Sequence, residues 1–423
     1  MPKPKYDLVI INANELVTLS GPKRARIKNE LSDLAIVRNG AIGISNGVIK
    51  FVGRTSEIDG SGKVELDASG KTVIPGLVDP HTHLVFAGSR EFELDMKLKG
   101  MSYMEIMKHG GGIYSTVRAT RSASFDDLLQ HTKKTLDIML SYGTTTVEGK
   151  SGYGLNKEDE IKMLEVMAEL SKEHVCTIVP TFLGAHAVPL EYKDDAQRYV
   201  QLLIEEIIPE VGKRKLAKFC DVFAEKDVFS IEDARRILNA GIKHGMRAKI
   251  HADEIVRLGG AELAAEVHAI SADHLLMASD DGLGKMADAG VIGVLLPGTP
   301  YTLMQREYAN ARKMISMGVP IALATDYNPN CWTESMQLII SFACYLMRMT
   351  PAEALSASTI NAAYAIGLGD SIGSLEVGKA GDVLILDVPN HLWIPYHYGI
   401  NHVLMTIKSG KIVFKRDEKQ SNK

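Results

Sequence analysis

The chain has 423 residues, of which 45% are hydrophobic and 24% are charged, and this composition excludes a wholly disordered protein. Its formal net charge of −4 argues against a dedicated nucleic-acid-binding protein, because such proteins carry a basic excess. No apolar run approaches the roughly 18 residues that cross a bilayer, so we expect no membrane partner. The four cysteines form no Cys-x-x-Cys pair, which predicts reduced thiols in a cytoplasmic protein.

The two ends of the chain share one pattern. Residues 1–72 contain short β-type runs, such as 7–11, separated by glycine turns at intervals near ten residues. The tail returns to this pattern, for example at 382–387. Neither flank is sufficient for a separate β-domain. We therefore predict that 1–72 and 367–423 pair as one small, discontinuous β-sandwich domain.

The residues between the flanks, 73–366, alternate between short apolar β-rich segments and helical stretches. The β-rich segments are 73–78, 144–148, 177–182, 216–222, 246–251, 269–274, 291–295 and 320–325. This alternation predicts an α/β fold with a parallel sheet. Eight repeats favour closure into a (β/α)₈ TIM-type barrel, whose chemistry lies at the carboxyl ends of the strands. An open, doubly wound sheet is the alternative, but polar residues follow several strands and do not mark a single crevice.

The strongest local motif is His81-Thr82-His83, which directly follows the apolar stretch 75–80. Residues two apart in an extended strand point to the same side, so both imidazoles can face one point at the barrel mouth. Imidazole nitrogen suits zinc and iron. A His-x-His pair can also lie on a plain surface, but the preceding strand and proline turn favour a metal site.

Other predicted strands also end in histidine or aspartate. His251 follows the fifth, His274 the sixth and Asp326 the eighth. A single strand-end histidine is usually a hydrogen-bonded core residue, but several at one barrel mouth are difficult to explain by structure alone. Together with His81 and His83, His251 and Asp326 offer three nitrogens and one oxygen, and a catalytic metal needs a further position for water. His274 is then a neighbour of the metal shell, not a certain ligand.

These motifs resemble the amidohydrolase superfamily and, within it, the imidazolonepropionase family. The stretches that carry the closer resemblance are 81–90, 148–155, 182–189 and 325–329. The resemblance covers essentially the whole chain. It implies hydrolysis of the cyclic amide of 4-imidazolone-5-propanoate to N-formimino-L-glutamate, a step of histidine degradation. It also implies one metal ion per chain, zinc or iron, and a homodimer.

The resemblance also implies roles for individual residues. The implied metal ligands are His81, His83, His251 and Asp326. The implied substrate contacts are Arg90, Tyr153, His186, Glu254, Asn328, Asn330 and Cys331. At the last two positions the chain departs from the small residues that we expect in many relatives.

The chemistry of these side chains fits the implied reaction. Arg90 offers a planar fork that matches a carboxylate, although a surface arginine is its alternative reading. We expect Asp326 to orient or deprotonate the attacking water, and His274 to assist proton transfer. Glu254 is expected to bond a ring N–H or to pass a proton to the leaving nitrogen, and His186 to hold the ring. Structural roles remain the alternatives for Glu254 and His186.

Several competing interpretations remain at this level. A related barrel could open another cyclic amide or deaminate an amino-purine, but a neutral base does not need Arg90. A non-catalytic scaffold is disfavoured because the metal set is complete. Lys150 follows the second strand, whereas a carbamylated lysine that bridges two metals is expected near the fourth, so we predict one metal. The tripeptide Gly110–Gly112 lacks the ending of a phosphate-binding loop and is expected to be a loop near the mouth, a candidate lid.

Overall fold

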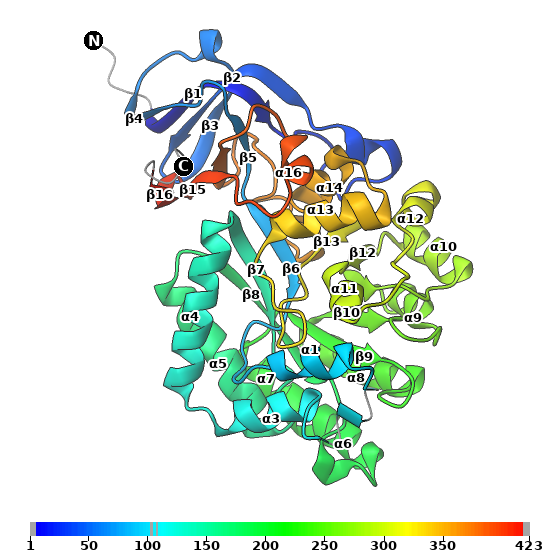
Figure 1. Ribbon diagram of the computed structural model, residues 1–423. Helices are drawn as coiled ribbons and strands as arrows, with labels where there is room; N and C mark the ends of the chain where they lie inside the picture. Colours follow the sequence, from blue (N-terminus) through cyan, green and yellow to red (C-terminus); the bar gives the residue numbers. More distant parts are fainter. Residues whose placement is uncertain (1–5, 102–104, 107–108, 418–423) are drawn as a thin grey trace.

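The computed structural model describes residues 6–101, 105–106 and 109–417. It contains two eight-stranded sheets, and Figure 1 shows them one above the other. The central sheet is parallel and consists of β6 (Leu77–Thr82), β7 (Thr144–Lys150), β8 (Thr177–Ala185), β9 (Phe219–Ala224), β10 (Arg247–Ala252), β11 (Ser271–His274), β12 (Ile292–Leu295) and β13 (Ile321–Leu323). These strands follow one another in chain order, and the predicted (β/α)₈ barrel is confirmed.

The barrel closes where the chain leaves β13 and meets β6. Thr82 forms a parallel bridge with Tyr327. The His83 amide donates to the Tyr327 carbonyl at 2.8 Å, and the Asp326 amide donates to the His81 carbonyl at 3.2 Å. Closure therefore brings the end of the eighth strand against the His-x-His motif.

Helices surround the barrel and extend beyond its ends. Their bounds are α1 (Glu91–Leu98), α3 (Ile113–Ser122), α4 (Phe125–Ser141), α5 (Lys157–Glu173), α6 (Ala196–Leu202), α7 (Ile208–Arg214), α8 (Ile231–Lys243), α9 (Gly260–Glu266), α10 (Asp280–Ala289), α11 (Gly298–Thr302), α12 (Ala311–Met317), α13 (Met336–Met347), α14 (Pro351–Ala357), α15 (Ile360–Ala365) and α16 (Trp393–Tyr396). Local sequence sets many of their starts: Ser124 accepts a hydrogen bond from the Asp127 amide at the start of α4, in a capping box. No helix among the described residues is long and apolar enough to cross a membrane.

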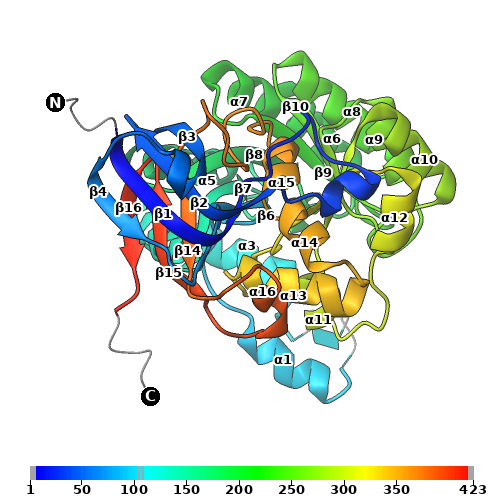
Figure 2. The same cartoon turned by 90° about the horizontal axis from the view of Figure 1, so that it is seen from above.

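The two flanks of the chain form the second sheet. Its strands are β1 (Tyr6–Val17), β2 (Ile36–Ser45), β3 (Val48–Arg54), β4 (Gly62–Asp67), β5 (Thr72–Pro75), β14 (Val383–Leu386), β15 (Val403–Lys408) and β16 (Lys411–Lys415). β5 pairs antiparallel with β14, which joins the N-terminal strands to the C-terminal ones. Figure 2 shows blue and red strands side by side at one end of the molecule. The predicted pairing of the flanks is therefore confirmed, while the exact division at 72/73 and 366/367 stays a prediction.

One predicted strand was wrong in its extent. The segment 73–78 is not a single barrel strand, because it breaks at Gly76 into β5 of the flank sheet and β6 of the barrel. The Gly76 amide donates to the Asp382 carbonyl at 3.0 Å. A Cβ at this position would lie 2.3 Å from Thr145 Oγ1, so only glycine lets the chain pass from one sheet to the other.

The barrel interior changes from apolar to charged toward the mouth. Val78, Val179 and Phe219 belong to a buried apolar cluster inside it. The Lys249 ammonium lies 5.6 Å from the centre of the Phe219 ring, at the border of this cluster. Residues two further along the strands, such as His251, then reach the carboxyl end of the barrel. The fold thus presents a polar cluster on an apolar base.

Candidate active site

Buried polar atoms without partners converge at the carboxyl ends of the barrel strands. Among the described residues, five of these atoms have no hydrogen-bond partner: His81 Nε2, His83 Nδ1, His251 Nε2, His274 Nδ1 and Asp326 Oδ1. Ligand atoms of His81, His83 and Asp326 lie within 4.8 Å of one another, and so do those of His81, His251 and His274. Unpartnered buried polar atoms are costly, and an ion beside Asp326 Oδ1 would satisfy that oxygen and His81 Nε2, with His83 Nε2 also 3.5 Å from the oxygen. The cluster therefore fits a metal ion.

Two aspartates orient the central imidazoles, and the sequence analysis did not single them out. Asp273 Oδ2 lies 2.6 Å from His81 Nδ1, and Asp221 Oδ1 lies 3.2 Å from His251 Nδ1. A carboxylate at one ring nitrogen fixes the tautomer and leaves the other nitrogen available for a metal. Burial, reinforced by the charge of Lys150, lowers the pKa of His81, so its imidazole is neutral as ligation requires.

Two buried lysines balance the charge of these carboxylates. Lys150 Nζ donates to Asp221 Oδ2 at 2.7 Å and to Glu148 Oε1 at 3.0 Å, and it lies 3.6 Å from Asp273 Oδ2. Lys249 Nζ donates to Glu148 Oε2 at 2.9 Å. Burial opposes the charge of Lys150, but the three carboxylates outweigh this effect and raise its pKa. The number of metal ions stays a prediction.

Asp326 lies opposite the histidines of the first strand. Its Oδ1 is 3.5 Å from both His81 Nε2 and His83 Nε2, and its Oδ2 accepts a hydrogen bond from the Thr299 hydroxyl. Burial alone would raise the pKa of Asp326, but the contacts with His83, His274 and Thr299 lower it overall. The carboxylate is therefore ionised and can accept a metal or a proton.

His274 and Glu254 form a second pair at the mouth. His274 Nε2 lies 3.6 Å from Glu254 Oε2. His274 has a positive φ of 77°, which turns the chain at the end of β11. Burial raises the pKa of Glu254, while His274 acts in the opposite sense. A carboxyl group with a raised pKa beside an imidazole is suited to moving a proton.

The rings of Tyr153 and His186 pack against His83. The rings of His83 and His186 are stacked at 4.7 Å, and Tyr153 lies 5.7 Å from His83 and 5.3 Å from His186. His186 Nδ1 contacts the Gly152 carbonyl at 3.0 Å, and burial lowers the pKa of His186 well below its usual value. A neutral imidazole that donates from Nδ1 to a carbonyl leaves Nε2 as an acceptor.

Arg90 immediately precedes α1. Its guanidinium forms a two-point contact with Glu93: Nε donates to Oε1 at 2.7 Å and Nη2 donates to Oε2 at 2.8 Å. Burial raises the pKa of Tyr153, and the charge of Arg90 opposes this rise. The helix that Arg90 precedes is bonded to the loop after Asp326, because Lys97 in its last turn donates to Asn330 at 2.5 Å. The predicted carboxylate-binding arginine is thus near the other predicted site residues.

The loop after Asp326 is held largely by its own contacts. Asn328 donates to the Asp326 carbonyl at 2.7 Å, and its side-chain oxygen accepts from the amides of Asn330 at 2.8 Å and Cys331 at 3.0 Å. Asn330 accepts from Lys97 Nζ at 2.5 Å. Cys331 is buried, and its thiol contacts the Thr325 carbonyl at 3.5 Å. Substrate contacts at these three positions stay predictions, and the Cys331 thiol faces the protein.

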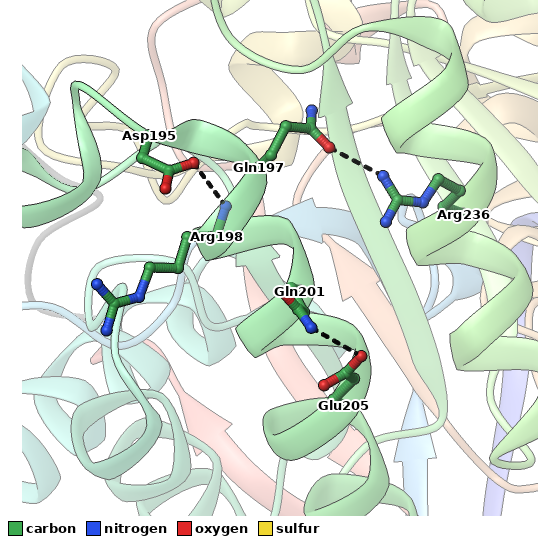
Figure 3. Close-up of a pocket in the computed structure, with 6 residues that line it drawn as sticks. All are labelled: Asp195, Gln197, Arg198, Gln201, Glu205 and Arg236. Atoms are coloured by element: carbon green, nitrogen blue, oxygen red, sulfur yellow. Dashed lines mark hydrogen bonds between the residues drawn. The ribbon is translucent and has the colours of Figure 1, made fainter.

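A separate hollow lies on the outer surface beside α6 and α8 (Figure 3). It is lined by Asp195, Gln197, Arg198, Gln201, Glu205 and Arg236. Its polar groups pair with one another: Gln197 accepts from Arg236 at 3.0 Å, and Gln201 donates to Glu205 at 3.1 Å. These six residues are all different from the predicted site residues. We therefore assign the chemistry to the barrel mouth.

Comparison with known proteins shows the family to which the chain belongs. The amidohydrolase family model matches residues 72–413. An imidazolonepropionase from Geobacillus thermodenitrificans is 56% identical over 414 residues, which cover 96% of this chain and 97% of the relative. One from Brevibacillus brevis is 53% identical over 421 residues, 98% of each chain. The chain belongs to the imidazolonepropionase family. It is therefore an amidohydrolase that acts on a carbon–nitrogen bond, and the family resemblance seen in its sequence is confirmed.

Solved structures agree on the fold of this imidazolonepropionase family member. A zinc-bound adenosine deaminase from Xanthomonas campestris superposes with a TM-score of 0.73 at 19% identity, covering 97% of this chain and 93% of that one. A 5-methylcytosine deaminase from Klebsiella pneumoniae gives a TM-score of 0.74 at 17% identity, with coverage of 97% and 98%. At these identities the likeness establishes the barrel with its flank sheet.

Proposed function

We propose that the protein hydrolyses the ring amide of 4-imidazolone-5-propanoate to N-formimino-L-glutamate, in the degradation of histidine. The observation that carries this proposal is Arg90, whose guanidinium binds a carboxylate and whose helix is bonded to the loop after Asp326, next to a cluster of buried metal-type ligands. The substrate has the matching parts, namely a propanoate tail and a cyclic amide. The relatives named imidazolonepropionase support the same assignment.

We further propose that one zinc or iron ion is held by His81, His83, His251 and Asp326. The unpartnered Nε2 atoms of His81 and His251 and the Asp326 oxygen support this set, as does the distance of 3.5 Å from His83 Nε2 to that oxygen. His274 is near enough to His81 and His251 to take part. Zinc and iron both accept such nitrogen and oxygen ligands. An ion held there would polarise a water molecule, so that water attacks at neutral pH.

The remaining side chains would bind and orient the substrate. Arg90 would hold the propanoate, with the Tyr153 hydroxyl as a second donor. His186 would accept or donate a hydrogen bond at the ring. The loop with Asn328, Asn330 and Cys331 would complete the site, mainly through its backbone at Cys331, because that thiol is buried.

Hydrolysis requires two proton movements in this site. A C–O bond forms at the ring carbonyl carbon, and the ring C–N bond breaks. Asp326 would take a proton from the attacking water, since its carboxylate is ionised. Glu254 would deliver a proton to the leaving nitrogen, with His274 at 3.6 Å as its exchange partner.

The test is hydrolysis of freshly prepared 4-imidazolone-5-propanoate, followed by ultraviolet loss of the ring. We expect turnover that a chelator abolishes and that added zinc or iron restores. Arg90→Gln should raise KM at least tenfold, whereas Arg235→Gln on the outer face of α8 should leave KM unchanged. Failure of the fully metallated protein to turn over this substrate would refute the assignment, and other cyclic amides and amino-purines would then be assayed.

We also propose a cytoplasmic homodimer. Exposed aromatic side chains gather around α13 and α16: Tyr345, Tyr396 and Tyr398 are 60%, 71% and 65% exposed, and the rings of Tyr345 and Tyr398 are 5.8 Å apart. Such patches often mark subunit contacts. Sedimentation equilibrium would test this proposal, and a monomer at micromolar concentration would contradict it.

A further inference from the structure

The tripeptide Gly110–Gly112 has a structural partner that its sequence did not reveal. The Gly112 amide donates to Glu93 Oε1 at 2.7 Å. A Cβ at Gly111 would lie 2.8 Å from the same Oε1 and 2.7 Å from Ile106 Cγ2. The φ of Gly112 is +72°, a conformation that favours glycine. The glycines thus let the backbone approach a buried carboxylate closely.

The same carboxylate holds Arg90. Glu93 is 1% exposed, and its two oxygens accept from Nε and Nη2 of Arg90 at 2.7 and 2.8 Å. Two parallel bonds of this kind fix both the position and the plane of a guanidinium. Burial would raise the pKa of Glu93, but Arg90 and the Gly112 amide lower it overall. Glu93 is therefore a charged link between the glycine turn and the arginine.

Helix α1, which carries Glu93 in its first turn, is also tied to the loop after β13. Lys97, in its last turn, donates to Asn330 at 2.5 Å, and the Asn330 amide donates to the side chain of Asn328. In Figure 1, α1 lies at the end of the barrel away from the flank sheet. The guanidinium is thus held by Glu93 at the start of a helix that is bonded to two loops, one with Gly112 and one with Asn330.

We infer that Glu93, supported by Gly111 and Gly112, is a positioning residue that sets the guanidinium of Arg90 for the carboxylate tail of the substrate. Glu93 itself does not touch the substrate. The inference rests on the proposed function, in which Arg90 binds the propanoate. It assigns the tripeptide a role in substrate specificity, in place of phosphate binding.

The physical reason is the conformational freedom that a guanidinium loses when it binds a carboxylate. A fixed fork loses little freedom when a second carboxylate binds, whereas a mobile arginine must be ordered at the expense of affinity. Loss of Glu93 should therefore weaken recognition of the tail and leave recognition of the ring unchanged. Metal content should not change, because Glu93 bonds to none of the proposed ligands.

The experiment compares two ligands in wild-type protein and in Glu93→Gln, with Glu91→Gln as the matched control. Glu91 lies in the same helical turn but is exposed and bonds to Ser89. The probes are imidazole-4-propanoate, which carries the tail, and 4-ethylimidazole, which does not; calorimetry measures both. We expect Glu93→Gln to weaken the tailed probe by about 10- to 100-fold and the tail-less probe by less than twofold. The Glu91→Gln variant should bind both probes as the wild type does.

Gly111→Ala provides an independent perturbation from the opposite side. It should reproduce the selective loss, because its Cβ displaces the Glu93 carboxylate while Arg90 and Glu93 both remain. Equal weakening of both probes, or no weakening of the tailed one in either variant, would overturn the inference. Wild-type preference for the tailed probe without turnover of 4-imidazolone-5-propanoate would refute the proposed reaction and leave the role of Glu93 intact.

Discussion

Asp273 offers a quantitative test of how the barrel prepares its proposed metal site. Its Oδ2 lies 2.6 Å from His81 Nδ1, while its Oδ1 accepts from the Ser271 hydroxyl at 2.6 Å. In Asp273→Asn the shape is retained, but the charge that orients the imidazole is lost. Loss of such a partner typically lowers metal affinity about 10- to 100-fold, which corresponds to about 1.4–2.7 kcal/mol.

The affinity is measured by competition with a chromophoric chelator, after the protein has been stripped and reloaded with zinc. The two oxygens of Asp221 lie 3.1 and 3.2 Å from His251 Nδ1, farther than Asp273 Oδ2 from His81 Nδ1, so we expect Asp221→Asn to cost less than Asp273→Asn. Asp281→Asn, at an exposed position on α10, is the control and should leave the affinity unchanged. Asp273 also lies 3.6 Å from Lys150, so its substitution can lower the stability of the fold as well as the metal affinity. Urea unfolding of the metal-free proteins measures the loss of stability separately. An affinity of Asp273→Asn within twofold of the wild type would refute the reasoning.

Three further predictions concern stability. Lys150→Met removes three buried ion pairs and should cost about 3–5 kcal/mol in urea unfolding. Lys99→Met, at an exposed pair, should cost less than about 1 kcal/mol, and equal losses would contradict this prediction. Gly143→Ala places a side chain on a residue with a φ of 93°, and its Cβ would lie 2.6 Å from Leu384 Cδ1. The variant should be less stable than the wild type by about 1–3 kcal/mol. An unchanged urea midpoint would rule out the proposed strain. Burial lowers the pKa of His131 below its value in the unfolded chain, so the unfolded chain binds more protons and wild-type stability falls as the pH drops through about 6.5. His131→Leu should therefore lose less stability than the wild type between pH 7.5 and 5.5. Parallel losses in the two proteins would count against this assignment.

The sequence was most informative where a property depends on a few neighbouring residues. The period of two in a strand places His81 and His83 on one side, whatever surrounds them. The alternation of apolar runs with helical stretches predicted the barrel, because each repeat is a local unit with a recognisable pattern. The same alternation placed His251, His274 and Asp326 at the ends of predicted strands.

Partners from distant strands could not be found in this way. Asp221 and Asp273 lie in apolar strand segments, and nothing in their neighbours indicates that they orient imidazoles of His251 and His81. Charged residues inside apolar strands, including Lys249 two positions before His251, were the available signal. The break at Gly76 was hidden because both halves of the segment are apolar and extended.

The sequence by itself determined the alternation of strands and helices and the common side of His81 and His83, because these depend on local periodicity. The pairing of the two flanks followed from a different argument, since neither flank alone was sufficient for a β-domain. The roles of the side chains at the barrel mouth stay predictions. Only the tertiary structure decided which of these side chains meet. The contact of Glu93 with Gly112 and the closure of Asp326 against His81 both depend on how the chain folds back. Such contacts depend on strand register and barrel closure, which involve the whole chain.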